Sequence, residues 1–373
     1  MRDHLRQMFH AGIGACLPET VLPRHLPAER PRVVLAIGKA AGAMARVAEA
    51  HYPGVSGLAV VPHGLEAGLA GIALLHASHP IPDEASVAAA ERLLALAAGG
   101  GALVLLSGGA SALACLPGEG LTLAGKQALT AALLRSGAAI EEINCVRRHV
   151  SRIKGGRLPA ALTLAISDVV GDRPETIGSG PTVADPTTVA DARAILDRYG
   201  LDARLTETAK RAAGEFRLVA GAQDLLSAAA AEAERLGHQP VLLGEWTGEA
   251  REIGARHAEI ALALPPGSAL ISGGELTVAV TGTGRGGPNL EYALGAAALL
   301  AGRPDIQGLA ADSDGIDGNS NVAGAFFSGA DAAGSGALAT NDSAVWFAAA
   351  GGLFAPGPTG TNVNDLRIIL VGH

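Results

Sequence analysis

Short, uninterrupted hydrophobic runs recur along the chain, and small or acidic residues follow several of them. Val33 to Ile37 precede a glycine, Leu103 to Leu106 precede Ser-Gly-Gly, and Leu162 to Ile166 precede Ser-Asp. Runs of this length that are apolar at every position are typical of strands covered on both faces by helices. Strands are expected at residues 32–38, 57–61, 72–75, 103–106, 162–168, 216–220, 240–243, 268–279, 307–311 and 366–371.

Segments with helical character separate these runs. Helices are expected at residues 1–17, 84–98, 122–136, 225–236 and 248–264, with two more between 187 and 212 and others opening after Lys39 and at Pro288. Asp83 is expected to cap the 84–98 helix. The alternation predicts two Rossmann-like α/β domains with mainly parallel sheets and a cleft between them.

The boundary between the two domains is expected after residue 212. Residues 1–212 would form the first domain and residues 213–373 the second, with a boundary nearer 240 as an alternative. The segment from 216 to 243 is expected to open the second domain as a βαβ unit.

The composition fits an α/β protein and excludes several function classes. Hydrophobic residues make up 49% of the 373 residues and charged residues only 17%, the opposite of the balance in disordered chains. The formal net charge is -8 and no basic stripe occurs, so neither nucleic acid nor an anionic membrane is expected as a partner. The three cysteines are far apart and the first nine residues do not look like a secretory signal, so a cytoplasmic location is expected.

The strand end at Ser107-Gly-Gly-Ala-Ser111 is the most distinctive local feature. Ser107, Gly108, Gly109 and Ser111 supply backbone N–H groups and two hydroxyls where a helix is expected to begin, which suits an anion. Lys39 follows another strand and a single glycine, so its ammonium group is expected at a similar position. The alternative is a solvated lysine at the end of a helix.

The second half of the chain offers another glycine-rich loop, Thr281-Gly-Thr-Gly-Arg-Gly-Gly-Pro-Asn289. Its glycine spacing does not match a dinucleotide-binding fingerprint. Arg285 is expected to reach a phosphate or carboxylate, because the flanking Gly284 and Gly286 cannot obstruct its guanidinium.

Carboxylates follow two of the expected strands. Asp312-Ser-Asp-Gly-Ile-Asp-Gly318 holds three of them, and Asp314 is expected to face the site as a proton acceptor or metal ligand because Gly315 lets the backbone bend. The alternative is that all three form turns. Asp168 and Asp172 are candidate metal ligands at the start of a long polar loop.

Two further features stay open between a functional and a structural role. The segment Asn144–Gly156 is the densest basic region, with Arg147, Arg148, Arg152 and Lys154. It is either a solvated helix face or an anion contact at the edge of the domain. His79 lies in a proline-rich loop and is either structural or in contact with substrate.

Eight segments in order carry a shared pattern: Ala36-Ile-Gly-Lys-Ala-Ala41; Leu106-Ser-Gly-Gly-Ala-Ser-Ala112; Asn144 and Arg147 with Lys154-Gly-Gly156; Ile166-Ser-Asp-Val-Val-Gly-Asp172; Gly178-Ser-Gly-Pro-Thr182; Gly284-Arg-Gly-Gly-Pro-Asn-Leu-Glu291; Asp314-Gly-Ile-Asp-Gly318; and Gly360-Thr-Asn-Val-Asn-Asp365. Together they resemble the glycerate 2-kinases of the MOFRL type, some of which were once labelled hydroxypyruvate reductases. The resemblance runs from about residue 4 to the C-terminus. It departs from the usual pattern at Ser313 (threonine in the family) and at Asn319-Ser-Asn321 (Pro-Thr-Asp in the family), which removes a carboxylate.

The resemblance implies transfer of the ATP γ-phosphoryl group to a hydroxyl of D-glycerate, with 2-phosphoglycerate and ADP as expected products and Mg²⁺ as a cofactor. It implies a C-terminal domain of the MOFRL type. The expected site has catalytic Lys39, Arg285 and Asp314; substrate- or nucleotide-binding Ser107, Gly108, Gly109, Ser111, Gly284, Gly286, Asn289 and Asn364; and metal-binding Asp168, Asp172 and Asp317.

Two other functions are weighed against this one. A hydroxypyruvate reductase using NAD(P)H would need a nicotinamide site, and no correctly spaced glycine fingerprint is visible. A non-catalytic regulator that binds a nucleotide or sugar acid would need a DNA-binding or partner module, which neither charge nor an added segment suggests. The sequence leaves a homodimer open.

Overall fold

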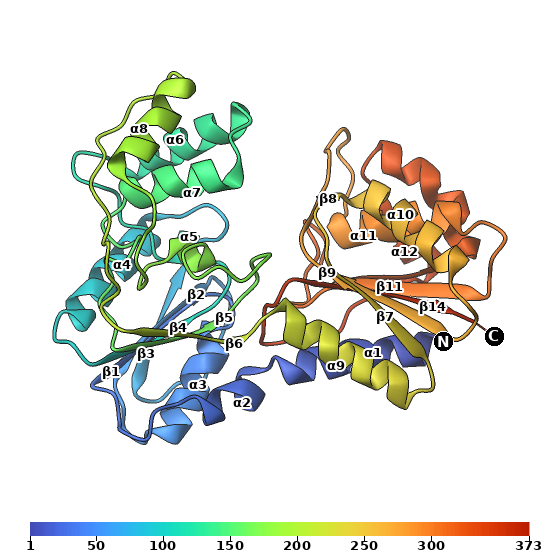
Figure 1. Ribbon diagram of the computed structural model, residues 1–373, viewed down its shortest axis with the longest axis horizontal. Helices are drawn as coiled ribbons and strands as arrows, with labels where there is room; N and C mark the ends of the chain where they lie inside the picture. Colours follow the sequence, from blue (N-terminus) through green and yellow to red (C-terminus); the bar gives the residue numbers. More distant parts are fainter. Residues whose placement is uncertain (373) are drawn as a thin grey trace. The chain divides into compact units, whose positions relative to one another are not determined.

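The computed structural model describes residues 1–372, which form two compact units (Figure 1). The N-terminal unit comprises Pro18–Asp168 and Asp172–Val219. The C-terminal unit comprises Met1–Leu17, Val169–Gly171 and the chain from Ala220 onward. The division therefore falls seven residues after the expected boundary, and the first helix belongs to the unit formed by the second half of the chain.

The N-terminal unit is built on a sheet with strand order β3-β2-β1-β4-β5-β6. The bounds are β1 Val33–Ile37, β2 Gly57–Pro62, β3 Ile72–Ala77, β4 Ala102–Leu106, β5 Leu162–Ile166 and β6 Glu215–Ala220. Strands β1 and β4 are buried at every position, as their continuous apolar sequence predicts. They pair in parallel, and β4 pairs in parallel with β5. The carboxyl ends of these three strands therefore meet at one edge of the sheet.

Helices cover both faces of this sheet; Figure 1 shows α3 on one face and α4 on the other. The bounds are α2 Pro18–Val21, α3 Ala41–His51, α4 Glu84–Ala97, α5 Ala110–Leu113, α6 Leu123–Arg135, α7 Ile140–His149 and α8 Val189–Arg198, with short 3-10 turns at Leu22–Arg24 and Ile177–Ser179. The predicted cap of α4 is confirmed, because the Ser86 N–H donates to the Asp83 carboxylate at 2.9 Å. Helices α6, α7 and α8 pack on one another around a small core that includes Leu133, Val146 and Leu196.

Only one of the two helices expected between residues 187 and 212 is present within the described chain. Helix α8 ends before Gly200, which has a φ of +64°. The chain beyond it hydrogen-bonds to the basic segment instead: the Thr206 N–H donates to the His149 carbonyl, and the Ala209 N–H to the Gly155 carbonyl. These long-range bonds replace the local bonds of a helix.

The C-terminal unit is built on a mixed sheet with strand order β13-β12-β11-β14-β9-β7. The bounds are β7 Gln239–Glu245, β9 Ser268–Gly273, β11 Ile306–Asp312, β12 Gly324–Ser328, β13 Leu353–Phe354 and β14 Asp365–Val371, with β8 Gly248–Glu249 and β10 Leu276–Thr277 forming a separate pair. Strands β7 and β9 are parallel, whereas β14 runs antiparallel to both β9 and β11. The α/β class is confirmed, but the second sheet is mixed rather than mainly parallel.

The mixed sheet follows from the short connection after β11. Residues 313–323 join β11 to β12, and a link of this length is short for the helical crossover that parallel strands need. Strand β12 therefore returns antiparallel to β11. The expected βαβ unit at 216–243 does not form, because β6 joins the first sheet and β7 the second.

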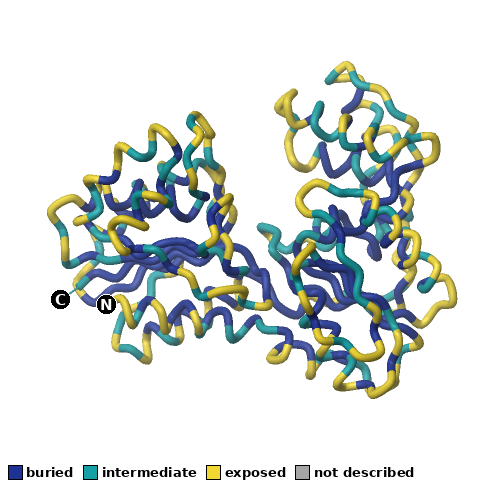
Figure 2. The backbone as a smooth tube through the Cα atoms, turned by 180° about the vertical axis from the view of Figure 1, so that it is seen from behind, coloured by how far each residue is buried: buried dark blue, intermediate teal, exposed yellow. Residues whose placement is uncertain are grey.

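Helices lie on both faces of the second sheet: Figure 1 shows α1 and α9 on one face, and α10, α11 and α12 on the other. The bounds are α1 Arg2–Ala15, α9 Ala222–Arg235, α10 Ala250–Ala263, α11 Pro288–Leu299 and α12 Ser343–Ala350, with a 3-10 segment at Gly329–Ala339. Figure 2 shows the central strands of each sheet as buried and the outer helix surfaces as exposed, whereas the edge strands β6 and β7 are largely half-buried or exposed. Among the described helices, none combines the length and apolarity needed to cross a bilayer.

Helix α1 is held on the C-terminal unit by its apolar face. Leu5, Met8 and Phe9 are fully buried. Gly12 lies so close to α9 that an added Cβ would be 2.9 Å from Leu225 Cδ1 and 3.0 Å from the Leu225 carbonyl oxygen. An added Cβ at Gly14, half a turn further on, would meet no neighbouring atom within 4 Å.

We therefore expect Gly12→Ala and Gly14→Ala to change stability in opposite directions. Alanine favours a helix over glycine by about 1 kcal/mol, so Gly14→Ala should raise the melting temperature. At Gly12 the same gain is opposed by a steric conflict of about 1–3 kcal/mol, so Gly12→Ala should lower it. Thermal unfolding of the two variants tests this, and equal shifts would show that α1 does not pack closely on α9.

Candidate active site

Lys39 is held at the carboxyl edge of the first sheet by the neighbouring strand end. The Lys39 N–H donates to the Gly108 carbonyl at 2.8 Å, and the Ala40 N–H donates to Ser107 Oγ at 3.1 Å. Gly38 has a φ of +134°, and a Cβ there would lie 2.1 Å from Ser107 Oγ. The fully buried Ser107 thus fixes the turn that carries Lys39, although its hydroxyl was expected to face a ligand.

Gly108 and Gly109 follow Ser107 at this edge; Gly108 is buried and Gly109 is half-buried. Within the described chain, neither N–H group donates a hydrogen bond to a protein acceptor. Gly109 has a φ of +81°, and a Cβ there would lie 3.1 Å from His79 Cδ2 and 3.4 Å from Lys39 Cγ. The structure therefore brings the side chains of Lys39 and His79 beside two backbone N–H groups that have no acceptor within residues 1–372, which is a suitable arrangement for an anion.

Ser111 lies two residues further along and contacts two cations that the expected site did not include. Its Oγ accepts hydrogen bonds from Arg147 Nη2 at 2.6 Å and from Lys154 Nζ at 3.0 Å, and lies 2.9 Å from Ser179 Oγ. The basic segment is therefore not simply a solvated helix face, because Arg147 and Lys154 turn inward to Ser111. In the sequence, both residues were marked by the density of basic residues between 144 and 156 and by the shared pattern of Asn144 and Arg147 with Lys154-Gly-Gly156.

The glycine-rich loop of the C-terminal unit is closed in comparison. Five of its backbone N–H groups already donate to protein acceptors within the unit: Thr281 and Gly282 to Asn341 Oδ1, Gly284 to the Thr340 carbonyl, Arg285 to Asp342 Oδ1, and Gly286 to Asn319 Oδ1. A Cβ on Gly284 would lie 2.6 Å from Asp342 Cβ, and one on Gly286 would lie 2.3 Å from Ser343 Oγ. Gly284 and Gly286 thus permit close packing, although we expected their amides to face a ligand.

Asp317 occupies the N-terminal end of α11. Its carboxylate accepts the backbone N–H of Asn289 at 3.0 Å and that of Leu290 at 2.9 Å, and Asn289 Nδ2 donates to Asp365 at 2.7 Å. Burial raises the pKa of Asp317 to about 7, against these hydrogen bonds and with a smaller contribution from the charge of Asp365. Asp317 and Asn289 are therefore better explained as a buried helix cap than as a metal ligand and a substrate contact.

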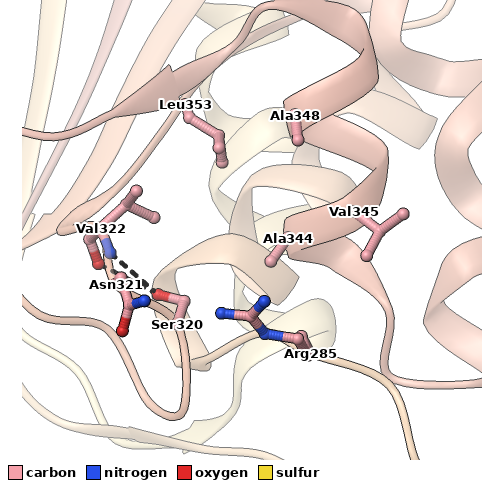
Figure 3. Close-up of a pocket in the computed structure, with 8 residues that line it drawn as sticks. All are labelled: Arg285, Ser320, Asn321, Val322, Ala344, Val345, Ala348 and Leu353. Carbon is pink, nitrogen blue, oxygen red and sulfur yellow. Dashed lines mark hydrogen bonds between the residues drawn. The ribbon is translucent and has the colours of Figure 1, made fainter.

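Arg285 is the charged side chain of this loop, and it is exposed. It lines a pocket of about 210 Å³ together with Ser320, Asn321, Val322, Ala344, Val345, Ala348 and Leu353. In Figure 3 its guanidinium extends toward Ser320. Within residues 1–372 the guanidinium forms no hydrogen bond or ion pair, so its donors are available to an anion.

Asp314 lies in the loop after β11, where each carboxylate also shapes the backbone. Asp312 Oδ1 accepts the Asp314 N–H, and Asp314 Oδ1 accepts the Ile316 N–H, both at 2.9 Å. Asp312 and Asp314 are half-buried. Asn364, in the facing turn, is buried, and its Oδ1 accepts the Asp365 N–H at 3.0 Å. Asp314 is not among the described residues that line the Arg285 pocket.

Two of the three expected metal ligands, Asp168 and Asp172, belong to the N-terminal unit, and the third, Asp317, belongs to the C-terminal unit. Asp168 and Asp172 are half-buried and flank Val169–Gly171, whereas Asp317 caps α11. In residues 1–372, no group of three or more His, Cys, Asp or Glu side chains is arranged to hold a metal ion. A divalent ion here would need oxygen ligands from its substrate or from water.

The buried Asp317 predicts a specific pH dependence of stability. The pKa of Asp317 is about 7 in the folded protein, above its ordinary value of 3.8. Its contribution to the free energy of unfolding is therefore complete below pH 3.8, where the carboxyl is protonated in both states, and is lost as the pH rises through 7. The loss is on the order of a few kcal/mol. We expect the free energy of unfolding to decline between pH 5 and 8 and the Asp317→Asn variant to show a flatter profile. Urea unfolding across this range measures it, with Asp312→Asn as the control that keeps the decline; identical slopes in all three proteins would contradict this origin.

Comparisons with known proteins cover the whole chain. A family profile described as "Domain of unknown function (DUF4147)" matches residues 4–213, and the "MOFRL family" profile matches residues 268–365. A protein from Agrobacterium vitis, provisionally named a hydroxypyruvate reductase, is 44% identical over 100% of this chain and 94% of its own length. Glycerate 2-kinase from Pyrococcus horikoshii is 37% identical over 91% of this chain and 87% of its own.

A crystal structure of glycerate kinase from Thermotoga maritima superposes with a TM-score of 0.88 at 36% identity, covering 98% of this chain and 97% of that one. The similarity thus extends over both units and over every segment that builds the two loops. This chain belongs to the family of glycerate 2-kinases that carry the MOFRL domain.

Proposed function

We propose that this protein is a glycerate 2-kinase that transfers the ATP γ-phosphoryl group to D-glycerate and releases 2-phosphoglycerate and ADP. The observation that carries the proposal is the edge of the first sheet, where Lys39 and His79 flank the open amides of Gly108 and Gly109. The relatives named glycerate kinase support it, because they match this chain over nearly its whole length.

The available groups suit phosphoryl transfer, which needs positioning and charge stabilisation more than covalent catalysis. Lys39 and the Gly108 and Gly109 amides would bind phosphate oxygens, and Arg285 would neutralise negative charge that develops on the transferred group. The hydroxyl oxygen of glycerate forms a bond to the γ-phosphorus while the bond to the bridging oxygen of ADP breaks. Asp314 would accept the hydroxyl proton.

We propose Mg²⁺ as the cofactor, held by Asp168 and Asp172. Mg²⁺ in nucleotide sites is usually bound by one or two carboxylates and by phosphate oxygens, so the lack of a larger ligand cluster in residues 1–372 fits this ion. When bound, it would neutralise charge on the β- and γ-phosphates. Asp317 would contribute only indirectly, through the position of α11.

A cytoplasmic location belongs to the same proposal. Cys16, Cys115 and Cys145 are free and buried, as in proteins that work under reducing conditions.

The reductase alternative has weaker support despite the name of the Agrobacterium relative. The turn from Gly38 to Ala41 has one glycine before a lysine, whereas a nicotinamide site of the usual kind needs three spaced glycines.

The purified protein should consume ATP only when D-glycerate and a divalent metal are both present. A coupled ADP assay measures the rate, and identification of the phosphoglycerate isomer shows which hydroxyl reacts. Excess chelator should abolish turnover. Turnover that persists in chelator would remove the metal from the proposal, and oxidation of NADH or NADPH by hydroxypyruvate at a comparable rate would favour the reductase.

Lys39→Ala and Arg285→Ala should each lower kcat strongly while the fold stays intact. Removing a charge-stabilising group from a phosphoryl-transfer site lowers the rate by about 10³–10⁵-fold. Arg211→Ala changes an exposed cation outside the site and serves as the control. Steady-state kinetics and thermal unfolding of each variant test these roles. A kcat within about threefold of the wild type would show that the residue is a solvated surface cation with no catalytic role.

A further inference from the structure

Two adjacent arginines on α7 have opposite environments. Arg148 Nε lies 2.9 Å from the Asp185 carboxylate, and its two terminal nitrogens donate to Glu175 O and Thr187 Oγ1. Arg147 forms a single side-chain hydrogen bond within residues 1–372, from Nη2 to Ser111 Oγ. Arg147 is half-buried, and its remaining side-chain N–H donors have no acceptor within residues 1–372. The charge of Arg148 is compensated inside the protein, and that of Arg147 is not.

A second cation, Lys154, donates to the same serine as Arg147. Lys154 is 1% exposed, and its ammonium group donates to the Ser111 carbonyl at 2.6 Å, to Ser111 Oγ at 3.0 Å and to the Ala114 carbonyl at 3.4 Å. All of these acceptors are neutral. Burial lowers the pKa of Lys154 well below its usual value, and the charge of Arg147 lowers it further. Two neighbouring positive charges with no carboxylate partner in the described chain form a site whose missing component is an anion.

The hydroxyls next to these cations are held in a defined orientation. Ser111 Oγ accepts from both Arg147 and Lys154, so its own proton is directed to Ser179 Oγ, 2.9 Å away. Ser179 has a φ of +63°, which is unfavourable for a residue with a side chain. Its carbonyl accepts the Gly155 N–H, which ties this strained residue to the basic segment. Backbone strain of this kind is concentrated at binding and catalytic sites.

We propose that Arg147 binds the carboxylate of the acceptor substrate and determines that the substrate is an acid. Ser111 and Lys154 are positioning residues in this proposal: Ser111 orients the guanidinium, and Lys154 adds positive charge from beneath without reaching the ligand. The proposal rests on the function proposed above and assigns the substrate's carboxylate end to the N-terminal unit.

A carboxylate fits this site better than a nucleotide phosphate. The donors of Arg147 that have no acceptor within residues 1–372 belong to one planar guanidinium, whose fork matches the two oxygens of a carboxylate. The Lys154 donors are already used, so they cannot serve the several oxygens of a polyphosphate. Ser111 is also two residues from Gly109, beside which Lys39 lies. A short hydroxy acid could thus have its carboxylate at Arg147 and its reacting hydroxyl toward the phosphate site.

The test compares D-glycerate with glycerol, which has the hydroxyls but no carboxylate. The wild type should favour D-glycerate in kcat/KM by at least about 10³-fold, because a site built for a polar group rejects the analogue that lacks it. Arg147→Gln should lower kcat/KM for D-glycerate by about 10²-fold or more, and should leave KM for ATP and kcat/KM for glycerol within about twofold. Arg152→Gln, an exposed arginine of the same segment, should match the wild type.

Arg147→Lys keeps the positive charge but loses the forked guanidinium, so it should recover only part of the lost kcat/KM for D-glycerate. It should also remain folded if Arg147→Gln does not. A rise in KM for ATP with an unchanged KM for D-glycerate would overturn the carboxylate assignment in favour of a phosphate site. Unchanged kinetics in a folded Arg147→Gln protein would overturn it in favour of a structural role.

Titration calorimetry with D-glycerate and nucleotide-free protein separates this proposal from the kinase assignment. If the wild type binds D-glycerate without phosphorylating it and Arg147→Gln does not bind, the carboxylate site stands and the kinase proposal fails. If the wild type phosphorylates D-glycerate and Arg147→Gln binds it equally well, the kinase proposal stands and the carboxylate site fails. A wild type that neither binds nor phosphorylates D-glycerate overturns both.

Discussion

The close approach of Gly38 to Ser107 is the contact on which the N-terminal site depends. Parallel pairing places Ile37 beside Leu106, so the two strands end side by side and the next residues meet. The Ser107 N–H then donates to the Ile37 carbonyl, while Ser107 Oγ accepts the Ala40 N–H. A side chain at position 38 would overlap the serine hydroxyl. The position of Lys39 is therefore fixed by the sheet itself rather than by a flexible loop.

The two glycine-rich loops look alike in sequence and differ in physical role. At residues 108–109 glycine leaves backbone donors open, whereas at residues 281–287 it lets the loop pack against Asn341 and Asp342, which take those donors. The backbone N–H groups at the start of α11 likewise have an acceptor within the unit, the Asp317 carboxylate. A glycine-rich stretch indicates that the backbone closely approaches another group. Only the structure shows whether that group is a ligand or another part of the protein.

The parts of the fold that the sequence predicts are those set by local pattern. The buried strands β1, β4 and β5 and the Asp83 cap depend on residues adjacent in the chain. The antiparallel pairing in the second sheet and the position of α1 depend on long-range contacts, such as Gly12 with Leu225. In the site, Lys39 and Ser107 could be placed together because parallel strands share an edge. The role of Asp317 could not, because its partners lie 27 and 28 residues earlier and no periodic pattern connects them.

The path of the chain through the C-terminal unit also constrains the order in which that unit can form during synthesis. Helix α1 is made before α9, which begins more than 200 residues later, and β14, which follows the other described strands in the chain, lies between β9 and β11 inside the sheet. At about 5–20 residues per second, Leu5, Met8 and Phe9 would stay uncovered for at least roughly 10 s after they leave the ribosome. The sheet itself cannot close until residues 365–371 have emerged, so a chain that stops short of them lacks an interior strand rather than a frayed edge. The second unit can therefore be completed only after residues 365–371 have been made, by which time most of the N-terminal unit is already available to fold.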